Sequence, residues 1–138
     1  MPDDLMFVYG TLRKDTASPM KPILDQFCDL VGMATMKGRL YDLGRYPGVV
    51  LDEANGDPVF GQLFRLTDPA RVLSEFDYYE ECSDDFSAPH LYRREKVQVT
   101  MMSGETVLAW VYLYNRSTSG HIHIPAGDYI NYLAGKAS

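Results

Sequence analysis

The carboxylate of Glu80 stands out among the residues that could do chemistry, because the sequence pattern directs it toward an apolar interior. A helix predicted to begin near Asp68 has its apolar residues on one face: Val72, Leu73 and Phe76. At about 100° per residue, position 80 falls within this face, whereas Glu81 points toward solvent. Apolar neighbours disfavour a charged carboxylate and raise its pKa, which suits a general acid or base. We therefore expect Glu80 to be catalytic, unless the helix ends earlier and leaves it in a solvated loop.

A second candidate feature is the turn after the first apolar run, with the sequence Tyr9-Gly10-Thr11-Leu12. A glycine at the end of a strand allows a sharp turn that presents consecutive backbone N–H groups. Such groups can bind a substrate carboxylate or stabilise an oxyanion during a reaction. The turn is therefore a candidate substrate cradle, although a glycine in this position is also typical of an ordinary turn.

Three further side chains could reach a pocket beside this turn: Arg45, Tyr46 and Tyr129. Arg45 could bind a substrate carboxylate through its guanidinium, or it could pair with a surface acid. Tyr129 could line the pocket or anchor a terminal helix. We retain all three as candidate substrate-binding residues.

Two arrangements that suggest other chemistry are interpreted as structural. His121 and His123 would share one face of an extended segment, as metal ligands can, but no Cys, Asp or Glu follows at ligand spacing. We interpret the pair as part of an exposed loop, and we expect no metal or other cofactor. Cys82 would need a nearby histidine to act as a nucleophile, so packing or incidental exposure is the simpler interpretation.

The elements that must position these residues are predicted to be short strands and helices. Apolar runs and alternation predict strands at residues 5–9, 33–40, 49–51, 59–64, 96–101 and 107–114. Helical spacing predicts helices at residues 23–31, after Asp68, and at 128–133. Asn55-Gly56 and Ser103-Gly104 are each expected to close a hairpin.

Three smaller expectations concern individual segments. Residues 41–48 are predicted to form a loop. Cys28 is expected to pack in the core as part of the first helix. The segment Arg93-Arg94-Glu95 alternates along the start of a strand and is interpreted as a solvated edge.

The chain has 138 residues, of which 46% are hydrophobic and 23% charged, and this agrees with one folded domain spanning residues 1–138. Strands joined mostly as hairpins, together with two or three helices, predict the α+β class. We expect a small mixed or antiparallel β-barrel flanked by helices, rather than a doubly wound parallel sheet.

The charge balance restricts the partners of the protein. Nineteen acidic and thirteen basic residues give a formal net charge of −6, which disfavours nucleic acid and anionic membrane surfaces as main partners. A small molecule is the expected partner. The two cysteines do not form a disulfide framework, the acidic start Met1-Pro2-Asp3-Asp4 differs from a signal peptide, and no apolar run could span a membrane. We therefore expect a cytoplasmic location.

Several short motifs are distributed along almost the whole chain: VYGTLR at 8–13, GRLYDLGRYPG at 38–48, GQLF at 61–64, FDYYE at 76–80, YRRE at 92–95, AWVY at 109–112 and GDY at 127–129. Each motif alone is unspecific. In this order and spacing, the chain strongly resembles the γ-glutamylcyclotransferase-like family, also described as AIG2-like proteins.

This resemblance implies a mixed barrel flanked by helices, with one pocket at the turn formed by residues 9–12. It also implies a cyclisation in which a γ-glutamyl α-amine attacks its own γ-amide carbonyl, forming 5-oxoproline and releasing an amine. The family's essential glutamate corresponds to Glu80, which the helical face also selects. Backbone N–H groups around Gly10–Leu12 are the implied donors to the carbonyl oxygen, and no metal, nucleotide or covalent nucleophile is required.

The chain departs from the family pattern after Glu80, where residues 81–90 have the sequence ECSDDFSAPH. This link is rather long and acidic, so Glu81–Asp85 could be a solvated loop or a lid that selects a cationic leaving amine. Two other functions remain open: a non-catalytic module that binds a small ligand on the same fold, and another acid–base enzyme acting on a related amide. These residues specify neither the leaving amine nor the oligomeric state.

Overall fold

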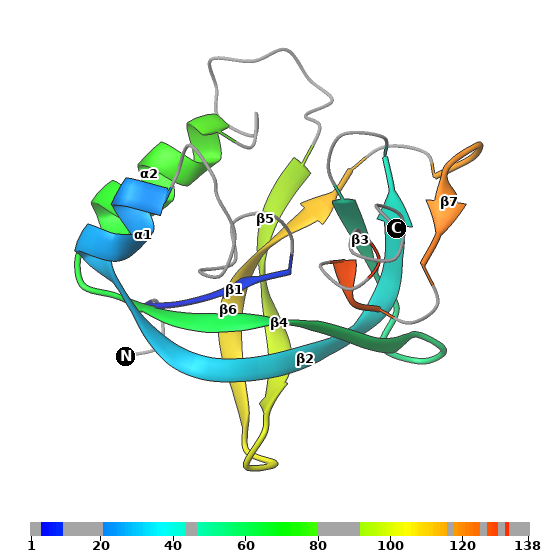
Figure 1. The fold of residues 1–138 in the computed structure, drawn as a ribbon, viewed down its shortest axis with the longest axis horizontal. Coiled ribbons are helices and arrows are strands. Elements are labelled where there is room, and N and C mark those ends of the chain that lie inside the picture. The colour runs from blue at the N-terminus through cyan, green and yellow to red at the C-terminus, as the bar shows by residue number, and fades with distance from the viewer. Residues whose placement is uncertain are drawn as a thin grey trace.

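The computed structural model describes residues 4–9, 21–43, 47–79, 92–115, 118–124, 127–129 and 132 (Figure 1). Its elements are, in chain order, β1 (Leu5–Val8), α1 (Lys21–Phe27), β2 (Cys28–Asp42), β3 (Pro47–Leu51), β4 (Asp57–Leu66), α2 (Pro69–Tyr79), β5 (Tyr92–Met101), β6 (Thr106–Tyr114) and β7 (Ile122–His123). Among these described residues, no helix is long and apolar enough to cross a membrane.

Five strands close into a barrel in the order β2-β4-β1-β6-β5. The closure is made by β5 returning to β2, where Ala34 pairs with Met101 and Thr35 with Thr100. The barrel is mixed, because β1 runs antiparallel to β4 and parallel to β6. Strands β3 and β7 pair with β2 outside the closed path. The predicted α+β class, with a small mixed barrel flanked by helices, is therefore confirmed.

Strand alternation divides the core into two layers. On β6, the inward side chains of Ala109, Val111 and Leu113 belong to the buried cluster inside the barrel. The intervening Tyr112 and Tyr114 belong to a second cluster, outside the barrel. This is the period of two expected for a strand whose two faces meet different surroundings.

Helices α1 and α2 cover one outer face of the barrel (Figure 1). The second cluster lies between them and the sheet, and it contains Met6 and Val8 of β1 together with Phe76 of α2. The two helices also contact each other, since the Arg71 guanidinium lies 4.7 Å from the centre of the Phe27 ring. Strand β1 is therefore buried on both faces, as its continuous apolar run predicts.

The second predicted hairpin and the predicted start of α2 are both confirmed. Strands β5 and β6 pair from Tyr92 with Tyr114 to Thr100 with Thr106. Their turn places Gly104 at φ +92°, in the left-handed region that favours glycine.

The predicted helix at residues 23–31 is wrong beyond Phe27, where α1 ends and β2 begins. Cys28 pairs with Leu66 and Leu30 with Phe64, so these residues form part of the barrel. The helical spacing of Leu30 is incidental, because its side chain is 45% exposed. Tertiary pairing outweighs local spacing here. Cys28 is buried, as expected, although it lies on a strand.

The predicted hairpin at Asn55-Gly56 is also wrong. Residues 52–56 do form a turn, in which the Gly56 N–H donates to the Asp52 carbonyl at 2.8 Å. However, β3 and β4 on its two sides pair with successive stretches of β2. The loop predicted at 41–48 is shorter than expected, because Asp42 pairs with Pro47 across it.

Candidate active site

Helix α2 carries the apolar face that the sequence predicts. Val72 and Phe76 are completely buried, and Leu73 is 8% exposed. The helix begins at Pro69 after Asp68, whose carboxylate accepts a hydrogen bond from the Arg71 N–H at 3.4 Å. Glu80 follows the last helical residue in sequence but lies outside the described residues, so its inward orientation stays a prediction.

Tyr9, the first residue of the predicted cradle, follows β1 and belongs to the buried cluster inside the barrel. Its hydroxyl donates a hydrogen bond to the backbone carbonyl of Tyr112 on β6, at 2.6 Å. A buried hydroxyl needs such a partner, and this one ties the end of β1 to β6. Gly10–Leu12 are not among the residues that the structure describes, so the cradle itself stays a prediction.

A partly buried polar contact anchors the other segment of interest, the last turn of α2. The Asp77 carboxylate accepts two hydrogen bonds from the Arg94 guanidinium, at 2.7 Å from Nε and 3.1 Å from Nη2. It also accepts a hydrogen bond from the Tyr112 hydroxyl at 2.8 Å. Tyr112 thus contacts the end of β1 through its carbonyl and the end of α2 through its hydroxyl.

Asp77, Arg94 and Tyr112 were not selected by sequence reasoning. The interpretation of residues 93–95 as a solvated edge is wrong for Arg94, whose side chain is only 24% exposed. It holds better for Arg93, which is exposed and pairs with Glu95. The available signal was the alternation of β5, which places Arg94 on the opposite face from Val97, but alternation does not reveal that α2 covers the outer face.

Tyr129 lies in a cluster of polar aromatic side chains beside the end of β2. It is buried, and its ring stacks on that of Tyr132, with the ring centres 6.3 Å apart. The Tyr132 hydroxyl donates to the buried Asp42 carboxylate at 2.8 Å. The Tyr132 N–H bonds the Asp128 carbonyl at 3.0 Å, as in the predicted terminal helix. Gly127 supports this segment at φ +71°, with its carbonyl bonded to the Phe60 N–H.

Burial raises the pKa of the Tyr129 hydroxyl, and the negative charge of Asp42 and then the nearby Tyr132 raise it further. Above pH about 10 the unfolded chain therefore loses this proton more readily than the folded protein. The contribution of the protonated Tyr129 hydroxyl to the free energy of unfolding is present below pH about 10, and it is lost as pH rises through the raised pKa of the folded state.

We expect the free energy of unfolding to decline less steeply above pH about 10 in Tyr129→Phe than in the wild type. Urea unfolding of both proteins at a series of alkaline pH values measures this difference. Titration of the other tyrosines contributes to both curves and cancels in the comparison. Parallel pH dependences in the two proteins would contradict the raised pKa.

The candidates Arg45 and Tyr46 belong to a part of the chain that is not described, as do Cys82 and the acidic segment Glu81–Asp85. The structure describes the residues on the two sides of 44–46. Asp42 pairs with Pro47, whose carbonyl accepts a hydrogen bond from the Tyr92 hydroxyl at 2.6 Å. These contacts tie the base of the segment to β5.

The two histidines contact different tyrosines. The His121 ring lies 6.0 Å from that of Tyr114, and the His123 ring lies 5.4 Å from that of Tyr41. His123 is exposed, as expected, but it lies on the short strand β7 rather than in a loop. Within the described ranges there is no group of three or more His, Cys, Asp or Glu that could hold a metal ion.

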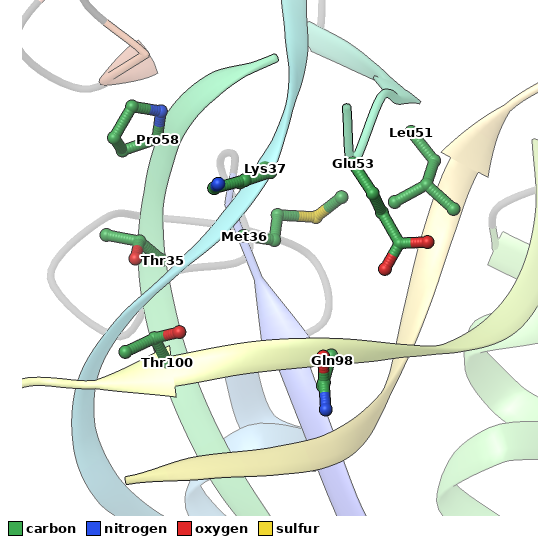
Figure 2. Close-up of a pocket in the computed structure, with 8 residues that line it drawn as sticks. All are labelled: Thr35, Met36, Lys37, Leu51, Glu53, Pro58, Gln98 and Thr100. Atoms are coloured by element: carbon green, nitrogen blue, oxygen red, sulfur yellow. The ribbon is translucent and has the colours of Figure 1, made fainter. Parts of the chain in front are cut away.

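A cavity of about 360 Å³ opens between β2 and β5, near the end of β3 (Figure 2). Its described lining residues are Thr35, Met36, Lys37, Leu51, Glu53, Pro58, Gln98 and Thr100. Neither Tyr9 nor Tyr129 is among them. We therefore do not assign this cavity to the predicted substrate pocket.

Comparison with known proteins identifies the family. Residues 6–131 match the family described as gamma-glutamyl cyclotransferase, AIG2-like. The chain belongs to this family. The resemblance seen in the sequence motifs is thus confirmed, and γ-glutamyl cyclotransferase-like proteins are enzymes.

Three relatives illustrate the range of the γ-glutamyl cyclotransferase family. The chain is 32% identical over 112 residues to gamma-L-glutamyl-butirosin B gamma-glutamyl cyclotransferase of Niallia circulans, covering 80% of this chain and 67% of that protein. It is 28% identical over 134 residues to the gamma-glutamylaminecyclotransferase of Bos taurus, covering 89% and 73%. It is 30% identical over 127 residues to the family protein YtfP of Escherichia coli, covering 91% and 96%.

The fold is shared as well. The solution structure of YtfP from Escherichia coli matches with a TM-score of 0.66 and 27% identity, over 93% of this chain and 97% of that one. The closed barrel with additional strands and few helices is therefore the architecture of the γ-glutamyl cyclotransferase family.

Proposed function

We propose that this protein is a γ-glutamyl cyclotransferase that converts the γ-glutamyl group of a small substrate to 5-oxoproline and releases an amine. Family membership supports the proposal most strongly. The described framework also supports it, because Tyr9 and Tyr79 directly precede the two segments that the family motifs select, Gly10–Leu12 and Glu80. Tyr112 bonds both Tyr9 and Asp77, and so connects the elements that lead into those segments.

In the proposed reaction, Glu80 transfers protons between two nitrogen atoms of the substrate. The α-ammonium group first gives a proton to the carboxylate, and the resulting amine attacks the γ-carbonyl carbon. The new C–N bond closes a five-membered ring, and the original amide C–N bond breaks. Two protons pass in total from the attacking to the departing nitrogen, so the lactam keeps one hydrogen and the amine leaves as an ammonium.

The remaining candidate residues are proposed to hold the substrate. Because the attack is intramolecular, the protein mainly has to hold the substrate's γ-glutamyl group in a bent conformation, with the α-amine close to the γ-carbonyl carbon. Backbone N–H groups of Gly10–Leu12 would stabilise the negative charge that develops on the γ-carbonyl oxygen. Arg45 would bind the α-carboxylate, while Tyr46 and Tyr129 would line the pocket. This chemistry needs no cofactor.

The test is release of 5-oxoproline from four kinds of substrate: glutathione, a γ-glutamyl amino acid, a γ-glutamyl-ε-lysine isopeptide and a γ-glutamyl amine. The two relatives named for γ-glutamyl-butirosin B and for γ-glutamylamines favour the last two. We expect equal amounts of 5-oxoproline and amine, measured by mass spectrometry. The N-acetylated form of each substrate should not react, because it lacks the attacking amine. A folded protein that cyclises none of the four would contradict the proposal.

A further inference from the structure

The last turn of α2 is attached to the barrel by a charged contact of defined geometry. The Asp77 carboxylate accepts hydrogen bonds from both Nε and Nη2 of Arg94, and this two-point contact fixes the orientation of the two side chains as well as their distance. The Tyr112 hydroxyl bonds Asp77 Oδ1 at 2.8 Å, and also lies 3.5 Å from the Leu73 carbonyl one turn earlier. One carboxylate therefore joins the helix to two strands.

The groups that hold Asp77 are themselves held by the sheet. Arg94 and Tyr112 are direct partners across the β5–β6 ladder. The Arg94 guanidinium lies 4.3 Å from the centre of the Trp110 ring, which supports it from β6. The Tyr112 ring packs 6.4 Å from that of Phe76, between the helix and the barrel. Rigid strands thus determine where the Asp77 carboxylate lies.

The same connection continues to the end of β1. The Tyr112 carbonyl accepts a buried hydrogen bond from the Tyr9 hydroxyl at 2.6 Å. We call the four residues Tyr9, Asp77, Arg94 and Tyr112 the brace. In sequence, Tyr9 directly precedes Gly10, and Asp77 comes three residues before Glu80. The brace therefore connects the two elements that lead to the proposed cradle and the proposed acid–base residue.

We propose that Asp77 is a positioning residue for the cyclisation: through Arg94 and Tyr112 it sets the direction in which the chain leaves α2, and thereby aims Glu80 at the substrate held beyond Tyr9. This inference rests on the proposed function. It assigns a role to Asp77 and Arg94 that neither the helical face nor the motif pattern indicates.

The contact is better suited to orientation than to overall stability. The side chains of Arg94 and Asp77 are 24% and 20% exposed, so solvent screens part of their attraction. Misplacing a catalytic group by about 1 Å can lower a rate about 100-fold. Loss of the brace should therefore lower kcat by a larger factor than its effect on the free energy of unfolding would explain.

The experiment compares Asp77→Asn with the wild type, using whichever of the four test substrates has the highest kcat/KM. We expect kcat to fall about 10-fold to 100-fold and KM to change less than about threefold, at a temperature where both proteins are folded. The pH profile should keep its shape at lower amplitude, because Asp77 does not itself transfer the proton. If Asp77→Asn does not fold, Tyr112→Phe, which removes one hydroxyl, should show a smaller loss in kcat of the same kind.

A matched control lies on the same strand. Glu95 pairs with the exposed Arg93, so Glu95→Gln removes a neighbouring ion pair that is not part of the brace. It should leave kcat unchanged. Arg94→Lys keeps the charge but loses the two-point contact, and combining it with Asp77→Asn should cost no more than the single change. Unchanged kcat in Asp77→Asn, or an equal loss in Glu95→Gln, would overturn the proposal.

Amide hydrogen exchange separates this proposal from the proposed function. In Asp77→Asn, the amides of residues 76–79 should exchange at least about tenfold faster than in the wild type, while those of the first turn of α2 are unchanged. If the wild type releases no 5-oxoproline but this local effect is present, the proposed function fails and the brace remains. If exchange is unchanged or changes uniformly along α2, the positioning role fails even in an active enzyme.

Discussion

Replacing Glu80 with glutamine should lower kcat for 5-oxoproline release about 10²-fold to 10⁴-fold, with little change in KM. Glutamine has nearly the size of glutamate but cannot accept the proton of the substrate's α-ammonium group, so the attacking amine is not formed by the protein. Binding of the γ-glutamyl group should persist, because the change leaves untouched the proposed cradle and Arg45, which is proposed to bind the α-carboxylate. Steady-state kinetics of the wild type and the variant measure the effect, with whichever of the four test substrates has the highest kcat/KM.

Helix α2 provides a matched control for this change. Glu75 is an exposed carboxylate five residues before Glu80, and Glu75→Gln should leave kcat at the wild-type value. Glu80→Asp, which retains a carboxylate on a shorter side chain, should fall between the wild type and Glu80→Gln. Full activity in Glu80→Gln would show that another group moves the proton, and that an inward-pointing Glu80 contributes to packing alone.

Local signals in the sequence predict the elements that depend on neighbouring residues. The apolar run of β1, the proline start of α2 after Asp68 and the β5–β6 turn at Gly104 are all recognisable because each is set within a few positions. The apolar face of α2 is likewise a local property, and it is confirmed by the burial of Val72 and Phe76. Continued by one turn, the same face predicts that Glu80 also points inward.

Elements that depend on distant partners could not be predicted in this way. Residues 28–30 lie in a segment predicted to be helical, but their partners are on β4, more than 30 positions later. The turn at Asn55-Gly56 resembles a hairpin turn, yet both of its strands pair with the 15-residue β2. Local sequence specifies that a turn forms here, whereas the pairing is decided by which long strand is available.

The supporting contacts of the candidate site are long-range for the same reason. Asp77 lies 17 positions from Arg94 and 35 from Tyr112, and Asp42 lies 90 positions from Tyr132. Asp77, Arg94, Tyr112 and Asp42 all lie in the short sequence motifs, but the motifs do not show which of these residues contact one another. They meet only because α2 packs on the outer face of β5 and β6, and because the chain after β7 returns to the end of β2. Sequence reasoning therefore selects a candidate catalytic segment, but not the long-range contacts that hold the helix leading into it.

Replacing Phe76 with alanine should reduce the free energy of unfolding by about 3–5 kcal/mol. The side chain is completely buried between α2 and the barrel, where its ring lies 6.4 Å from that of Tyr112. Truncation loses the transfer free energy of the ring and leaves a cavity that rigid strands cannot close. Since small domains are stable by about 5–15 kcal/mol, this one change removes a large part of the total. Urea unfolding, with the slope compared between proteins, measures the loss.

Glu75→Ala is the control on the neighbouring, exposed position of the same helix, and it should change the free energy of unfolding by less than about 0.5 kcal/mol. A loss below about 1 kcal/mol in Phe76→Ala would mean that α2 does not pack on the barrel as the structure has it. Phe76→Leu should retain much of the stability, because it keeps most of the buried volume. If Phe76→Leu folds well but loses turnover, correct seating of α2 matters to the reaction separately from stability, as the brace requires.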